Sequence, residues 1–180
     1  MKLHYLANPA YVLYDLFANG VYGLGSAASC NVPSIITMAA QLHAEGLGIS
    51  RVWYDASAED IETEILQLID AVRYRNPVDG TVTYKLIRDD FDVETIPHLT
   101  DSEIIRFKAR GEGLSYIASR LSIEYTDIEA GYKTIKVTTQ NTAARSALGK
   151  VVPVTISHPG AGTAEVAQKL STREGLKRTR

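Results

Sequence analysis

The chain has 180 residues, which is enough for one sizeable domain or two small ones. Its apolar fraction of 45% and charged fraction of 22% are typical of a globular protein. The net charge of −2 gives no electrostatic reason to expect nucleic acid or an anionic membrane as a partner. Cys30 is the single cysteine, which excludes an internal disulfide and a cysteine metal cluster. We expect neither a transmembrane helix nor a signal peptide.

The first predicted element is a short helix that begins at Pro9. Asn8 can cap it, and Pro9 occupies a position where a missing N–H costs nothing. Its apolar face consists of Val12, Leu13, Leu16 and Phe17. We expect Asn19 and Gly20 to end the helix in left-handed geometry, and the glycines at 23 and 25 to form a tight turn.

Two more helices are predicted before residue 77. One begins near Pro33, ends at Gly46 or Gly48, and buries Ile35, Ile36, Met38, Ala39 and Leu42. The other spans 57–73, with Ser57 and Asp60 as a capping box. Its buried positions recur at helical spacing: Ile61, Ile65, Leu68, Ile69 and Val72. Cys30 is expected to be a small buried side chain in the loop between the first two helices.

The hydrophobic period changes to two after residue 78. Strands are predicted at 82–86, 121–125, 135–139 and 151–156, with Pro153 placing the last at a sheet edge or a bulge. A long hairpin connection is expected over 127–132 and a short helix within 140–149. A final helix is capped by Thr163 and leads into a basic end.

These patterns predict an α+β fold built as a single unit over 1–180. A helical N-terminal half, 1–77, is followed by an antiparallel β-rich half, 78–180, with a C-terminal helix.

The segment 8–25, NPAYVLYDLFANGVYGLG, also carries a resemblance. It resembles a signature of the central tail-tip proteins of long-tailed bacteriophages, the host-specificity J or baseplate hub family. The second half extends the resemblance in the same order. The matching segments are YKLIRDDFD at 84–92, LSIEYTD at 121–127, KTIKV at 133–137, HPG at 158–160, and AQKL at 167–170 with Arg173. His158 stands where the family pattern has tyrosine.

The resemblance implies a structural component of a phage or prophage tail tip, taking part in tail assembly, host attachment and DNA delivery. It further implies a homotrimer that contacts other tail-tip, baseplate and tail-tube proteins, and possible contact with a host receptor through segments outside this chain. Such a protein belongs in the virion and is made in the cytoplasm of the bacterial host. Family members are usually much longer, so the chain is expected to be a fragment of the internal hub region.

The residues themselves predict no catalytic, cofactor or metal site, and we expect no enzymatic activity. The acidic cluster of Asp89, Asp90, Asp92 and Glu94 lacks the order of a calcium loop, which favours a solvated turn. His4, His43, His98 and His158 lack zinc-site spacing. The glycines at 20–25 follow a helix and lack the lysine of a phosphate loop. Gly160 and Gly162 precede a helix whose N–H groups could hold an anion, a signal too common to define a site.

An alternative hypothesis concerns residues 99–149. Leu99, Thr100 and Glu103, followed by Gly113, Ser115, Ile117, Ala118 and Leu121, resemble the helix-turn-helix of LuxR-type transcription regulators, with 133–136 and 148–149 extending the match. The spacing after Ser115 is two residues too short, and about ten extra residues precede Lys133. The β-branched run between 134 and 139 also favours a strand over a recognition helix.

Overall fold

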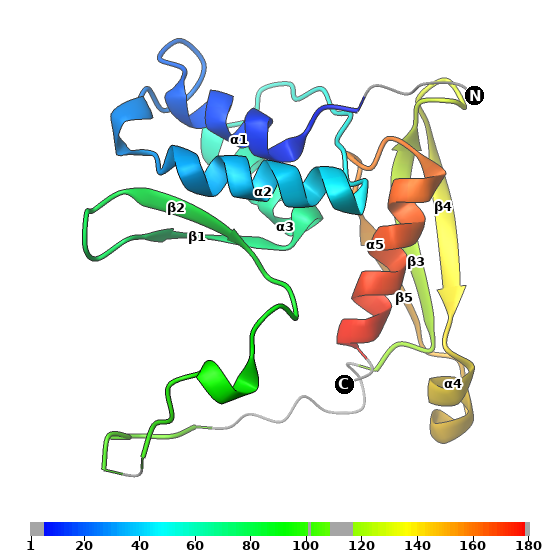
Figure 1. Cartoon of the computed structure of the whole chain (residues 1–180). Helices are drawn as coiled ribbons and strands as arrows, with labels where there is room; N and C mark the ends of the chain where they lie inside the picture. Colours follow the sequence, from blue (N-terminus) through cyan, green and yellow to red (C-terminus); the bar gives the residue numbers. More distant parts are fainter. Residues whose placement is uncertain (1–5, 101, 109–116, 179–180) are drawn as a thin grey trace.

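The computed structural model describes residues 6–100, 102–108 and 117–178 (Figure 1). The described residues form five α-helices and five strands, which confirms the mixed α+β class. The elements are α1 Pro9–Ala18, α2 Val32–Glu45, α3 Ala58–Ile69, β1 Ala71–Arg75, β2 Val82–Leu86, β3 Arg120–Asp127, β4 Lys133–Gln140, α4 Thr142–Leu148, β5 Pro153–Ser157 and α5 Ala164–Lys177. Two 3₁₀ turns, Ala27–Ser29 and Val93–Thr95, lie in the connections.

The helix starts follow the predicted caps. The side chains of Asn8, Ser57 and Thr163 each accept a hydrogen bond from a backbone N–H in the first turn of α1, α3 and α5. Helix α1 ends at Ala18, directly before Asn19 and Gly20, as predicted, but the end is not left-handed, because Asn19 is extended with φ −71° and Gly20 has no positive φ. The turn requires both predicted glycines, because a Cβ at Gly23 would clash with the backbone carbonyl oxygen of Leu16 and Gly25 has a left-handed φ of 62°.

The predicted third helix is too long at its C-terminal end. Helix α3 ends at Ile69, and Asp70 adopts left-handed geometry with φ 56°. Val72, which we expected on the buried helix face, lies in β1 and is 43% exposed. Strand β1 pairs antiparallel with β2, with Arg73 opposite Tyr84. This pairing supplies hydrogen-bond partners for the backbone of 71–75. The helical spacing of the apolar residues carries no information about such a partner strand.

A second sheet has the strand order β4-β3-β5. Strands β3 and β4 form the expected antiparallel hairpin, whereas β3 and β5 run parallel. The predicted antiparallel arrangement is therefore wrong for β3 and β5. The connection through α4 carries the chain from β4 to the opposite side of β3, where β5 pairs parallel to it. Pro153 begins β5, an edge strand, as predicted.

Helix α5 covers one face of the second sheet, and α1, α2 and α3 gather beside the β1–β2 hairpin (Figure 1). One hydrophobic core joins these parts and includes Leu13, Leu42, Ile65, Ile123 and Leu170. Ile36 was predicted to be buried, but it is 57% exposed on the outer side of α2. No helix among the described residues combines the length and apolarity needed to span a lipid bilayer.

The chain leaves this body after β2. The segment 87–108, green in Figure 1, runs away from the helices and sheets and carries the short 3₁₀ turn Val93–Thr95. We call its described residues, 87–100 and 102–108, the arm. The chain is next described at 117, shortly before β3.

Candidate functional site

The acidic cluster lies at the start of the arm. Asp90, Asp92 and Glu94 are exposed, and Asp92 accepts a hydrogen bond from the Glu94 N–H at 3.0 Å, which caps the 3₁₀ turn. Within the described ranges, no three His, Cys, Asp or Glu side chains are grouped so that they could hold a metal ion. The cluster is a charged turn of the arm.

Among the described residues, the histidines and the cysteine do not join other potential ligands in a group that could hold a metal ion. His4 lies outside the described residues, whereas His158 is buried after β5. Desolvation holds the pKa of His158 below its ordinary value, and its Nε2 atom has no hydrogen-bond partner in the described structure. Cys30 is buried as predicted, and burial raises the pKa of its thiol, which disfavours the reactive thiolate.

The two glycines before α5 serve close packing. A Cβ at Gly160 would lie 3.0 Å from a side-chain carbon of Ile49, and one at Gly162 would lie 2.7 Å from the Cβ of Ser50. These contacts explain why the chain uses glycine here without requiring an anion at the start of α5.

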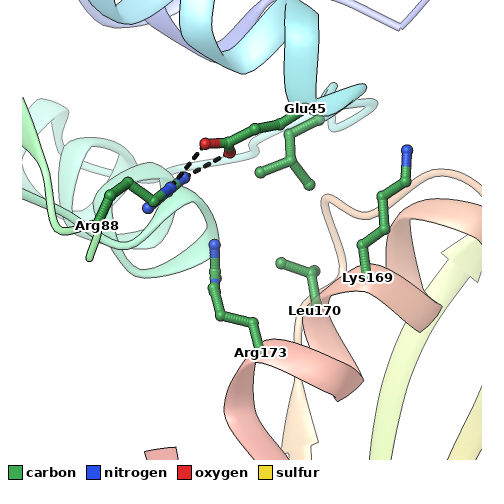
Figure 2. Close-up of a pocket in the computed structure, with 6 residues that line it drawn as sticks. Glu45, Arg88, Lys169, Leu170 and Arg173 are labelled. Carbon is green, nitrogen blue, oxygen red and sulfur yellow. Dashed lines mark hydrogen bonds and ion pairs between the residues drawn. The ribbon is translucent and has the colours of Figure 1, made fainter. Parts of the chain in front are cut away.

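A polar cluster that the sequence did not predict lies where α3 ends. Arg88, two residues after β2, donates from Nε and Nη2 to the two carboxylate oxygens of Glu45, at 2.8 and 2.7 Å (Figure 2). The same guanidinium donates to the carbonyl oxygens of Ile69 at 3.1 Å and Asp70 at 3.3 Å. Arg88 therefore joins the end of α2 to the C-terminal end of α3.

Two residues of α5 reach the same helix end. Arg173 donates from Nη2 to the carbonyl oxygen of Leu68 at 2.6 Å, and Lys177 Nζ lies 2.9 Å from a carboxylate oxygen of Asp70. Burial lowers the pKa of Arg173, whose Nε and Nη1 are buried without a hydrogen-bond partner in the described part of the chain. Basic groups are favourable here because the carbonyl end of a helix carries partial negative charge.

We call Glu45, Arg88, Arg173 and Lys177 the α3 junction. A pocket of about 350 Å³ lies beside it, lined by Glu45, Leu47, Arg88, Lys169, Leu170 and Arg173 (Figure 2). Arg88 is already engaged by Glu45 and by carbonyl oxygens, and Arg173 by the end of α3. The chemistry of this pocket is that of a structural clamp, which holds α2, α3, α5 and the start of the arm together.

The arm presents the second feature of interest, an exposed apolar surface. Its exposed apolar residues are Ile87, Phe91, Val93, Ile96, Leu99, Ile104, Ile105 and Phe107. Isolated exposed apolar side chains are common, but several along one short segment are typical of a segment that contacts a partner. The start of this segment was predicted as a charged loop, and the number of exposed apolar side chains along it was not predicted.

Neither a protein-family model nor a curated protein matches the chain.

Proposed function

We propose that this chain is a structural component of the tail tip or baseplate hub of a long-tailed phage or prophage. The observation that carries the proposal is the ordered set of segments at 8–25, 84–92, 121–127, 133–137 and 158–173, which resembles the central tail-tip protein family. The proposed roles are tail assembly, host attachment and DNA delivery, and the proposed location is the virion. In this role the protein acts through its surfaces and not as an enzyme.

The positions of these segments in the fold support the proposal. Segment 8–25 forms α1 and the turn that depends on Gly23, and 121–127 with 133–137 forms the β3–β4 hairpin. The segment 158–173 includes Arg173 of the α3 junction. Most of the resemblance therefore falls on the helices and strands of the body, whereas 87–92 of the segment 84–92 lie at the start of the arm.

The proposed assembly is a homotrimer that contacts other tail-tip, baseplate and tail-tube proteins. An exposed apolar arm is the kind of surface that such an assembly covers. The alternative regulator hypothesis needs a recognition helix at 133–139, but these residues belong to strand β4. Gly113 and Ser115 of that hypothesis lie outside the described residues. No observation favours the alternative over the tail proposal.

The test is to locate the chain on particles. An antibody raised against the purified chain would be applied to tailed particles made by the bacterium that carries the gene. We expect immunogold label at the tail end distal to the head, and label on the head or none on the particles would contradict the proposal. A parallel titration with duplex DNA tests the regulator hypothesis, for which affinity must fall steeply with salt.

A further inference from the structure

A second pocket lies between helix α2 and the β1–β2 hairpin, where α2 and β2 run side by side (Figure 1). It has a volume of about 260 Å³, and Asp90 at the start of the arm also lines it. Its apolar wall consists of Met38, Tyr84 and Leu86, which belong to the hydrophobic core. The volume lies just below the about 300–1,000 Å³ that is typical of sites for drug-sized ligands, so it fits a smaller molecule.

The side chain of Thr83, on β2, lines this pocket with a hydroxyl that lacks a partner. Thr83 is only 7% exposed, and its Oγ1 atom is buried without a hydrogen bond to any described residue. Buried hydroxyls are normally paired, because taking a hydroxyl out of water without a partner is unfavourable. A polar group of a molecule bound in the pocket would supply the missing partner.

Two opposite charges line the same pocket without pairing. Lys85 on β2 and Asp90 on the arm are both exposed, and neither side chain forms an ion pair or hydrogen bond with another described residue. The amide of Gln41 on α2 and the hydroxyl of Tyr74 on β1 are likewise without a partner in the described part of the chain. The pocket therefore combines an apolar wall with an available ammonium, an available carboxylate and neutral hydrogen-bonding groups.

This availability distinguishes the pocket from the one beside the α3 junction. There, Arg88 is engaged by Glu45, Arg173 donates to the end of α3, and Lys169 lies 2.8 Å from a carboxylate oxygen of Glu165. Charged groups that already have partners must give them up before they bind a ligand. The pocket beside β2 requires no such exchange.

We propose that the pocket between α2 and β2 binds a free α-amino acid with an apolar side chain. A purely anionic ligand would pair with Lys85 but bring its charge beside Asp90, and a purely cationic ligand would do the reverse. A zwitterion meets both charges, with its carboxylate on Lys85 and its ammonium on Asp90. Its apolar side chain packs on Met38 and Leu86, and the small volume favours a single amino acid over a longer peptide.

Binding is measured by nuclear magnetic resonance on the full chain labelled with nitrogen-15, titrated separately with L-leucine, L-methionine and L-phenylalanine. We expect at least one of them to bind with a dissociation constant of about 1 mM or lower, as is reasonable for about ten non-hydrogen atoms. The amide signals of Thr83, Lys85 and Asp90 should be among those that shift. Two derivatives of the bound amino acid serve as controls: the N-acetyl form lacks the ammonium, and the amide form lacks the carboxylate. Each should bind about tenfold more weakly or worse.

Variants of the lining residues test the location of the site. Lys85→Met and Asp90→Asn should each raise the dissociation constant about tenfold without changing Tm, because both side chains are exposed. Thr83→Val should raise it about threefold or more without lowering Tm, because the variant removes an unpaired buried hydroxyl. Lys133→Met, at an exposed lysine that begins β4, is the matched control and should bind as the wild type does.

Three outcomes would overturn the inference. The first is that none of the three amino acids binds at about ten times the expected dissociation constant. The second is that the amino acid and its two derivatives bind equally well, because the two charges then contribute nothing. The third is that Lys85→Met and Asp90→Asn both bind with wild-type affinity, which places the site elsewhere. None of these outcomes bears on the tail proposal, which the immunogold measurement tests separately.

Discussion

Replacing Arg88 tests whether the α3 junction holds the parts of the fold together. Arg88→Met keeps the aliphatic stem but removes two bonds to Glu45 and two to the carbonyl end of α3. A hydrogen bond from a charged donor contributes about 1.5–3 kcal/mol when well buried and less when exposed to solvent. The Arg88 side chain is 15% exposed and that of Glu45 is 29% exposed. We therefore expect Arg88→Met to lower the free energy of unfolding by about 2–4 kcal/mol.

The assay is urea unfolding followed by circular dichroism, with the free energy obtained by linear extrapolation. Arg120→Met is the matched control, since Arg120 is exposed at the start of β3, and it should change stability by less than about 0.5 kcal/mol. Adding Glu45→Gln completes a double-mutant cycle, and we expect a coupling of about 1 kcal/mol between Arg88 and Glu45. If Arg88→Met were no more destabilising than the Arg120 control, the junction would not hold the fold together.

Three further predictions concern stability. Ile65→Asp should unfold the chain because it places an unpaired charge in the core, whereas Ile36→Asp, on the exposed side of α2, should still fold. Equal melting temperatures of the two variants would refute the placement of Ile65 in the core. Gly23→Ala should destabilise the fold by about 2 kcal/mol through its clash with a carbonyl, which lowers Tm by about 4–8 °C in a chain of this size. Gly20→Ala meets nothing within 4 Å, so a similar loss in both would contradict the steric argument. The depressed pKa of buried His158 means that, below about pH 6.5, the unfolded chain binds more protons than the folded one, so stability should fall as the pH falls. The urea midpoint should therefore drop less between pH 7 and pH 5 in His158→Leu than in the wild type, and an identical drop would exclude this role.

The parts of the fold that could be predicted from sequence are those determined by neighbouring residues. The starts of α1, α3 and α5 follow from Asn8, Ser57 and Thr163, whose side chains act on N–H groups two or three residues away. The end of α3 was wrong because residues 71–75 are held by their pairing with β2, which no local pattern contains. Alternation also predicted β3 and β5 as strands but carries no information on whether they run parallel.

The α3 junction could not be predicted because its residues come from three separate segments that meet at the end of a fourth, α3. Arg88 belonged to an acidic run and Arg173 to a basic helix end, and both patterns are typical of solvent-exposed residues. Each became a junction residue only because α3 stops at Ile69 and leaves its last carbonyl oxygens facing them. The early stop of α3 is thus linked to the junction, since a helix continuing to residue 73 would have used those carbonyl groups itself.

The arm follows from the same geometry. Strand β2 ends beside the end of α3, and Arg88 fixes the chain there before the apolar and acidic segment begins. Phe91 and Val93, which follow this anchor, are exposed to solvent. Covering them would remove apolar area from water, which is favourable at about 25 cal/mol per Å².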